Sequence, residues 1–365
     1  MKRVLQIVDS MGYGGIQSFI MNVYRLIDRE EIQFDFLLHH KPSNSYDDEI
    51  LKMGGKIFYL PSRSEGVLKN RKALNEFFKN HKEYNVVHEH ESSLSYIEPL
   101  VIAKNHGVQV RIMHSHNTKM TQNIMHNMLH NLHSINIDKV ATNYLACGEL
   151  AGQWMYGKSK VKDKFYVLYN GISLKDYAYD AELRKSMRKE LGIHNEIVIG
   201  HAGRFTKVKN QKFLLEIFKE FHNKYENSFL VLAGDGDLFE KMQEYAKELN
   251  ISEYVKFLGM RNDIKRVIQA MDVMVLPSLH EGFPVIAIEA QANGLPVYLS
   301  DTITTEAVIK ENVHIVKLDL TAKEWAQNIS SDLRRIPDNH ILYNKGFDVN
   351  DVIKKLTNLY INGSI

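Results

Sequence analysis

The sequence predicts an α/β protein made of two doubly wound domains. Short apolar runs rich in β-branched residues alternate with longer segments in which apolar residues recur about every three to four positions, a pattern typical of βα units around a parallel sheet. This alternation starts a second time near residue 170. A chain of 365 residues is also too long for one core and suits two domains.

The first domain is expected over residues 1–170. Its opening run, "RVLQIVDS", has the pattern of a buried strand, and a helical pattern follows from Ile16 to Ile27. Further strands are expected at "FDFLL", "KIFYL", "NVVHEH", "QVRIMHSH" and "YLACG".

The second domain is expected over residues 171–345, and its series of strands opens with the run "FYVLYNGIS" (Phe165 to Ser173). Further strands are expected at "EIVIGHAGR", "SFLVLAGDGD", "VKFLG", "VMVLPS" and "LPVYLS". Helical patterns lie between them, as in "NQKFLLEIFKEFHNKY" and "LFEKMQEYAKELN". A ligand is expected in the cleft at the carboxyl ends of the strands.

Composition limits the class of protein. With 44% hydrophobic and 25% charged residues, the chain belongs among folded globular proteins. No apolar run reaches the roughly 18 to 20 residues that a membrane-spanning helix needs, and the opening run is too short for a signal peptide. The single cysteine, Cys147, suits a reducing compartment, so a cytoplasmic location is expected.

The charge is distributed unevenly along the chain. Residues 1–175 hold 22 Lys and Arg against 17 Asp and Glu, a net +5, whereas the whole chain has +2 and the remainder therefore −3. The basic half suggests contact with an anionic membrane surface, at the inner face of the cell membrane, as a hypothesis. No nucleic-acid partner is expected.

A glycine-rich loop, "DSMGYGGIQSF", follows the first strand. Gly12, Gly14 and Gly15 lack a Cβ, so backbone amides at the start of the next helix could approach a phosphate. A simple tight turn is the alternative. The spacing differs from G-x-G-x-x-G and no acidic residue ends the next strand, which disfavours NAD binding.

A basic loop, "GHAGRFTKVKNQ", lies between a strand and a helix of the second domain. Arg204 supplies a planar fork and Lys209 a mobile point charge, a combination suited to a diphosphate. The alternative is a solvated basic turn.

Two histidine pairs end neighbouring strands of the first domain. His88 with His90 and His114 with His116 could line a polar cleft, hold a metal ion, or be structural. The favoured interpretation is that these histidines line a cleft or form hydrogen bonds with a substrate.

The turn "AGDGDL" contains Asp235-Gly236-Asp237, which has the form of the D-x-D motif. In some sugar-transferring enzymes this motif binds a divalent metal ion and a diphosphate. Asp and Gly are also the residues that such a turn prefers, so a plain turn is favoured.

The stretch "PSLHEGFPVIAIEAQANGLPV" places Glu281 before a helix and Glu289 inside it. Pro284 suits the first turn, and Asn293-Gly294 suits the end. Two acids about two turns apart are poorly placed to flank one glycosidic bond as acid and base. Free backbone amides between them, at Gly282, Phe283 and Val285, are expected to face an anion.

These motifs together resemble the retaining glycosyltransferases of family 4, which have the GT-B fold of two Rossmann-like domains facing each other across a cleft. The E-x(7)-E motif from Glu281 to Glu289 carries the resemblance, with "AGRFTKVKNQ", "LVLAGDGDL", "VKFLGMRNDI" and "VLYNGISL" in the expected order. "RIMHSHNT" and "YLACGELAGQWMYG" are similar to the subgroup that builds capsular or extracellular polysaccharide.

The resemblance implies roles for individual residues. Glu289 would bind the donor's ribose, Glu281 would lie against the transferred sugar, and Arg204 with Lys209 would neutralise the leaving diphosphate. It further implies that His116 or the neighbouring His114 faces the reacting sugar, and that the C-terminal helix, about residues 346–365, crosses back to the first domain. The remaining donor-binding residues that it implies are Gly15, Asn170, Gly171, Gly259, Arg261, Gly282, Phe283, Pro284 and Val285.

The expected activity is metal-independent, retaining transfer of a hexose-type sugar without a cofactor. The expected donor is a UDP-hexose or UDP-N-acetylhexosamine, bound by the second domain. The expected acceptor is a growing glycan, free or lipid-linked, bound by the first. Three alternatives remain: a nucleotide-sugar epimerase or hydrolase of the same fold, a NAD-dependent oxidoreductase, and a metal hydrolase built on the histidines.

Overall fold

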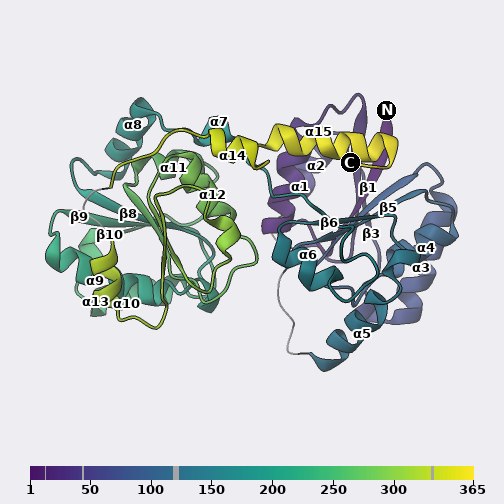
Figure 1. The fold of residues 1–365 in the computed structure, drawn as a ribbon, viewed down its shortest axis with the longest axis horizontal. Helices are drawn as coiled ribbons and strands as arrows, with labels where there is room; N and C mark the ends of the chain where they lie inside the picture. Colours follow the sequence, from purple (N-terminus) through teal and green to yellow (C-terminus); the bar gives the residue numbers. More distant parts are fainter. Residues whose placement is uncertain (13, 43–44, 118–122, 330–332) are drawn as a thin grey trace. The chain divides into compact units, whose positions relative to one another are not determined.

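The computed structural model describes the chain except residues 13, 43–44, 118–122 and 330–332. It divides into two compact units, the first made of Met1–Ile172 with Asp348–Ile365 and the second of Ser173–Phe347. Each unit is a parallel sheet covered by helices (Figure 1). The predicted α/β class with two doubly wound domains is confirmed.

The first unit contains a seven-stranded sheet in the order β3-β2-β1-β4-β5-β6-β7. Its strands are β1 (Lys2–Ile7), β2 (Ile32–Leu38), β3 (Ile57–Tyr59), β4 (Val86–Glu91), β5 (Val110–Ser115), β6 (Asn143–Ala146) and β7 (Tyr166–Val167). Its helices are α1 (Gly15–Leu26), α2 (Asp47–Lys52), α3 (Val67–Asn80), α4 (Glu98–Asn105), α5 (Ile124–Ser134), α6 (Glu149–Tyr156) and α15 (Val349–Asn362), with short 3-10 turns η1 (Arg63–Glu65) and η2 (Ile137–Lys139).

The second unit contains a six-stranded sheet in the order β10-β9-β8-β11-β12-β13. Its strands are β8 (Ile197–Ala202), β9 (Ser228–Ala233), β10 (Val255–Phe257), β11 (Val273–Leu276), β12 (Val297–Ser300) and β13 (Val313–Val316). Its helices are α7 (Leu174–Tyr177), α8 (Ala181–Leu191), α9 (Gln211–Lys224), α10 (Phe239–Glu248), α11 (Ile264–Ala270), α12 (Val285–Ala292), α13 (Ala322–Asn328) and α14 (His340–Asn344), with 3-10 turns η3 (Lys207–Lys209), η4 (Ser252–Tyr254) and η5 (Thr305–Ala307).

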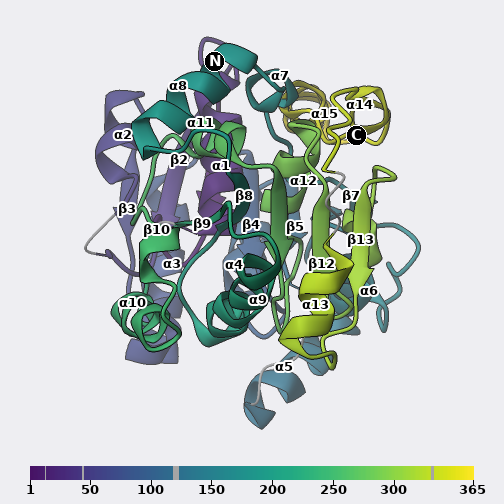
Figure 2. The same ribbon diagram turned by 90° about the vertical axis from the view of Figure 1, so that its left-hand side faces the viewer.

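Both sheets are buried on two faces, which explains the near-continuous apolar runs of their strands. All seven residues of β2 are buried, for example. In the second unit, α9 and α13 pack side by side over one face (Figure 2), and α8, α11 and α12 contribute to the core on the other. The cores hold the strand ends, and so the loops that follow them, in fixed positions.

One strand lies in a different place from the one predicted. The run Phe165 to Ser173, predicted to open the second series, instead supplies β7, which pairs with β6 and closes the edge of the first sheet. A two-residue edge strand has no periodicity of its own, so only its pairing partner reveals the sheet to which it belongs.

Helix α15 belongs to the first unit although it ends the chain. Val352, Leu356, Leu359 and Tyr360 are buried in the same core as α1 and β1, and the two helices lie side by side (Figure 1). The amide of Val349 donates to the carbonyl of Ile172 at 2.9 Å. The C-terminus therefore completes the unit that the N-terminus begins.

Candidate active site

The loops that follow β8 and β11 form the centre of the candidate site in the second unit. These strands are adjacent and parallel, although β9 and β10 separate them in the sequence. In open doubly wound sheets this change of strand order is where ligands bind, beyond the carboxyl ends of the strands. The loop after β8 carries Arg204 and Lys209, and the loop after β11 carries Glu281.

Lys209 and Glu281 form a bidentate ion pair across this point. Lys209 Nζ donates to Glu281 Oε1 at 2.6 Å and to Oε2 at 2.8 Å, and Ser278 Oγ donates to Oε1 at 2.8 Å. The side chains are only 22% and 10% exposed, so water screens the pair weakly. Glu281 is thus held as a paired carboxylate, and neither partner swings freely.

Backbone contacts tie the two loops together. Asn210 adopts a left-handed conformation, with φ 56°, and its side-chain amide donates to the carbonyl of Pro277 at 3.0 Å. The amide of Leu279 donates to the carbonyl of Val208 at 2.8 Å. Because each loop is fixed to the other, the ion pair is preorganised.

Arg204 differs from Lys209 in being exposed. Its carbonyl accepts from Gln211 Nε2 at 3.0 Å, but its guanidinium makes no ion pair with any carboxylate in the described part of the chain. The structure leaves this cation facing solvent at the switch point. That Arg204 and Lys209 converge on one anion stays a prediction.

The start of α12 differs in one respect from the prediction. The amide of Val285, expected to be free for a ligand, donates to the carbonyl of Phe283 at 3.0 Å, so that prediction is wrong for this conformation. The cause is local: Pro284 precedes the helix as its N-cap residue, with ψ 83°, and the chain bends back on itself there. The ring of Phe283 packs against Phe347 with centroids 5.9 Å apart.

Glu289 lies one turn inside α12 and is paired with a residue that the sequence analysis missed. Tyr177 Oη donates to Glu289 Oε1 at 2.8 Å. Burial raises the pKa of Glu289 to about 7, although the Tyr177 hydrogen bond acts in the opposite direction. Tyr177 is the only side-chain hydrogen-bond donor to Glu289 among the described residues. The carboxylate is costly to bury with one such donor, and it can still accept hydrogen bonds from ligand hydroxyls.

Gly259 and Arg261 were also predicted to bind the nucleotide-sugar donor. Gly259 adopts φ 64°, and its carbonyl accepts from the amide of Gly234 at 2.8 Å. The guanidinium of Arg261 is bound to Asp263 at 2.7 Å and to Glu190 at 3.0 Å. Both residues therefore have structural partners, and their contact with a nucleobase stays a prediction.

The Asp-Gly-Asp turn has a structural explanation. Gly236 adopts φ 151°, and a Cβ there would lie 2.6 Å from the carbonyl oxygen of Phe205. Asp235 Oδ1 accepts from the amide of Gly236 at 2.8 Å. The turn packs closely against the loop after β8, which supports the favoured reading of a plain turn.

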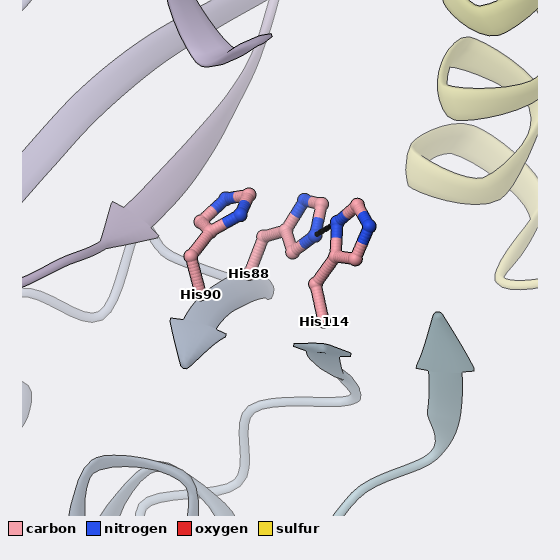
Figure 3. Close-up of side chains that lie close together, drawn as sticks. All are labelled: His88, His90 and His114. Atoms are coloured by element: carbon pink, nitrogen blue, oxygen red, sulfur yellow. Dashed lines mark hydrogen bonds between the residues drawn. The ribbon is translucent and has the colours of Figure 1, made fainter. Parts of the chain in front are cut away.

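The four histidines meet in the first unit, at the switch point between β1 and β4. His88 and His90 on β4 and His114 on β5 point to one face of the sheet (Figure 3), and His116 follows β5. His88 Nε2 and His114 Nδ1 are 3.1 Å apart, and His90 Nδ1 and His116 Nε2 are 3.0 Å apart.

A neighbouring amide oxygen fixes the tautomers of two of these rings, His90 and His116. Gln6 Oε1 accepts from His90 Nε2 at 2.8 Å, so His90 Nδ1 must accept from His116 Nε2. Tyr360 Oη on α15 lies 2.8 Å from His88 Nδ1. Burial lowers the pKa of all four imidazoles, that of His116 to about 3, and the rings are therefore neutral.

The packing of these rings disfavours a metal centre. The nitrogen atoms of His88, His90 and His114 do lie within 4.8 Å of one another. However, His88 and His90 stack at 4.1 Å with an interplanar angle of 27°, so their in-plane lone pairs do not converge on one point. The ring of Phe19 contacts the rings of His90, His114 and His116. Hydrogen bonds occupy both nitrogens of His88 and of His90, whereas His114 Nε2 is buried without a partner in the described structure.

The remaining predicted residues of the first unit are Gly15, Asn170 and Gly171. Gly15 begins α1, and an added Cβ would meet nothing within 4 Å. At Gly171 a Cβ would lie 2.8 Å from Val352 Cγ2 and 2.9 Å from Val349 Cα, so α15 requires a glycine. Asn170 Oδ1 is buried without a partner in the described structure. Contact of these residues with a donor stays a prediction.

Three residues around these sites were not predicted. Tyr177 meets Glu289 across 112 positions, and Tyr360 meets His88 across 272. Gln6 lies in the first strand, where it reads as one polar residue in an apolar run. No local pattern marks such partners, because tertiary packing alone brings them together.

Comparison with known proteins identifies the family. Residues 184–346 match the model described as glycosyl transferases group 1. EpsF of Bacillus subtilis (strain 168), named as a glycosyltransferase, is 34% identical to this chain over 98% of the chain and 96% of its own length. The chain belongs to the group 1 glycosyltransferases. Membership of this family removes the oxidoreductase alternative.

Two other proteins are similar to this glycosyltransferase along most of its length. An Escherichia coli protein, named UDP-Gal:alpha-D-GlcNAc-diphosphoundecaprenol alpha-1,3-galactosyltransferase, is 28% identical over 95% of this chain and 94% of its own length. The structure of HepE from Anabaena in complex with UDP and glucose superimposes with a TM-score of 0.78 at 18% identity, over 98% of both chains. The predicted GT-B fold is thereby confirmed. In the described part of this glycosyltransferase, no helix is both long and apolar enough to cross a bilayer.

Proposed function

We propose that this glycosyltransferase moves a hexose-type sugar, with retained configuration and without a metal ion, from a UDP-linked donor to a growing glycan. The observation that carries the proposal is the preorganised Lys209–Glu281 pair beside the exposed cation of Arg204. Cleavage of a sugar–diphosphate bond develops negative charge on the leaving group. Fixed cations at that position stabilise the transition state without reorganisation.

The pairing of Glu281 supports retention without a dedicated protein base. Both oxygens of the Glu281 carboxylate already accept hydrogen bonds from Lys209, at 2.6 and 2.8 Å, so the ion pair engages this side chain. In our proposal Glu281 orients Lys209 and the transferred sugar, and the leaving phosphate takes the acceptor's proton. The α-linked product in the name of the Escherichia coli relative is consistent with retention, since UDP-galactose also carries its sugar in α linkage.

We assign the donor's ribose to Glu289 and the reacting sugar to His116 rather than His114. His114 is fully buried, whereas His116 is partly exposed. With Nε2 of His116 donating to His90, its Nδ1 is left as an acceptor for a hydroxyl.

The names of two similar proteins support the proposed substrate classes. The HepE complexes favour UDP, and the Escherichia coli relative favours a diphosphate-linked polyprenol glycan as acceptor. We propose the same class of acceptor for this chain, in the synthesis of a capsular or extracellular polysaccharide. A thermal-shift screen against nucleotide sugars would identify the donor, because the preferred donor stabilises the folded protein by mass action.

Lys209→Ala tests the proposal. We expect its kcat to fall by about 10² to 10³, the usual loss when one transition-state donor is removed, with a smaller change in donor KM. Lys207→Ala, an exposed lysine of the same loop, is the matched control and should keep its turnover. Intact turnover in Lys209→Ala would refute the diphosphate role. UDP release that does not require an acceptor would instead favour the hydrolase or epimerase.

A further inference from the structure

Helix α5 of the first unit is amphipathic, but its polar face packs against the protein and its apolar face points to solvent. His126 Nε2 lies 2.7 Å from Ser93 Oγ, and His130 Nδ1 accepts from the amide of Leu94 at 3.0 Å. His133 Nδ1 donates to the carbonyl of Leu94 at 2.6 Å. The His130 ring stacks on Trp154 with centroids 4.4 Å apart. The histidine face thus anchors the helix to the protein.

The opposite face is apolar and exposed. With about 3.6 residues per turn, the positions four, eight and eleven residues after Ile124 form one stripe with it, and Met125 lies at the edge of that stripe. Its side chains are between 55% and 76% exposed, and they are Ile124, Met125, Met128, Leu132 and Ile135. Large apolar side chains that gather in one exposed patch, rather than lying singly on the surface, mark interaction sites.

Basic residues beside α5 indicate what covers this stripe. The segment 158–164, "KSKVKDK", exposes four lysines against one acid, Asp163. It adjoins α5 directly, because Lys158 Nζ donates to Asn131 Oδ1 at 3.3 Å. An apolar face with flanking lysines is complementary to a membrane interface of anionic lipid, where apolar side chains enter the acyl region and lysines meet the headgroups.

We propose that α5 docks on an anionic lipid surface through the stripe of Ile124, Met125, Met128, Leu132 and Ile135, with the lysines of segment 158–164 at the headgroups. This contact goes beyond the proposed transfer reaction and does not depend on it. If the acceptor is lipid-linked, the contact also holds the first unit beside that acceptor.

The test measures binding of the full chain to vesicles of phosphatidylcholine with and without phosphatidylglycerol, by co-sedimentation. Met128→Gln with Leu132→Gln keeps helix-forming residues of similar size and should weaken binding by roughly tenfold or more. Lys160→Gln with Lys162→Gln should weaken it by roughly 30-fold at low salt. Matched controls on α3 are Val67→Gln with Leu68→Gln and Lys72→Gln with Lys79→Gln. They change two apolar and two basic residues that are also exposed, and both variants should bind as the wild type does.

Insertion of the α5 stripe into the bilayer is measured separately. A tryptophan placed in the stripe, Met128→Trp, should shift its emission to the blue and be quenched by brominated lipid when anionic vesicles are added. Vesicle binding that the α5 variants do not reduce would overturn the proposal. A second result would also overturn it: the wild type does not bind vesicles but forms dimers, and the double change Met128→Gln with Leu132→Gln dissociates these dimers. A second copy of the chain would then cover the stripe. UDP binding by each variant, measured without vesicles, reports separately on the proposed function.

Discussion

Replacing Glu289 by Gln should stabilise the second unit in a pH-dependent way. The buried carboxyl accepts one hydrogen bond, from Tyr177 at 2.8 Å, and burial raises its pKa from 4.5 to about 7. An acid whose folded-state pKa is raised contributes stability that is fully present below the unfolded pKa and lost as the pH rises through the folded pKa. Gln can still accept from Tyr177 but cannot ionise.

The magnitude follows from the two pKa values. The interval from 4.5 to about 7, at about 1.4 kcal/mol for each pH unit, amounts to roughly 3 kcal/mol at alkaline pH. Near pH 5 most of this cost is absent. The stability of Glu289→Gln relative to the wild type should therefore rise by about 2 kcal/mol between about pH 5 and pH 8.

Urea unfolding followed by tryptophan fluorescence measures this difference. The chain has two tryptophans, and Trp325 is buried in the second unit. In a Trp154→Phe background, Trp325 therefore reports on that unit alone. The control is Glu240→Gln, which removes an exposed carboxyl from α10 of the same unit. If Glu289→Gln and Glu240→Gln showed the same pH dependence, the cost assigned to buried Glu289 would be wrong.

Two further outcomes are expected. Gly171→Ala should destabilise the first unit by about 1 to 3 kcal/mol, because the new methyl group would meet Val352 and Val349 within 3 Å; thermal unfolding checks this against Gly15→Ala, where nothing lies within 4 Å. Asp235→Asn should keep transferase activity with and without a chelator, since Asn can accept the same hydrogen bond from the amide of Gly236, and loss of activity on chelation would refute the metal-independent mechanism.

The sequence predicted the fold well because both sheets are parallel and buried on two faces. Such strands appear as apolar runs, and the helices between them have their own period, so each element is visible locally. β7 was placed in the wrong series, since a two-residue edge strand leaves no pattern. The Val285 amide was expected to be free, but the bend at Pro284 satisfies it.

Motif spacing predicted which residues gather at each switch point, but not how they pair. Lys209 and Glu281 were assigned to different parts of a donor, and the structure joins them in an ion pair. The sequence left open whether the four histidines line a cleft, bind a metal ion or are structural. The structure stacks the rings of His88 and His90 and hydrogen-bonds them to Gln6 and to Tyr360 on the last helix, which disfavours convergent coordination, and the absence of a metal stays a prediction.

The sequence by itself determined the α/β class, the two series of strands and the family to which the motifs belong, because these depend on periodicity and on residues close together in the chain. Only the tertiary structure decided the partners of Glu289 and His88, the buried state of His114 and the outward-facing apolar side of α5. Each of these depends on contacts between elements far apart in the sequence. Burial and hydrogen bonding, which set protonation and exposure, exist only after those elements pack.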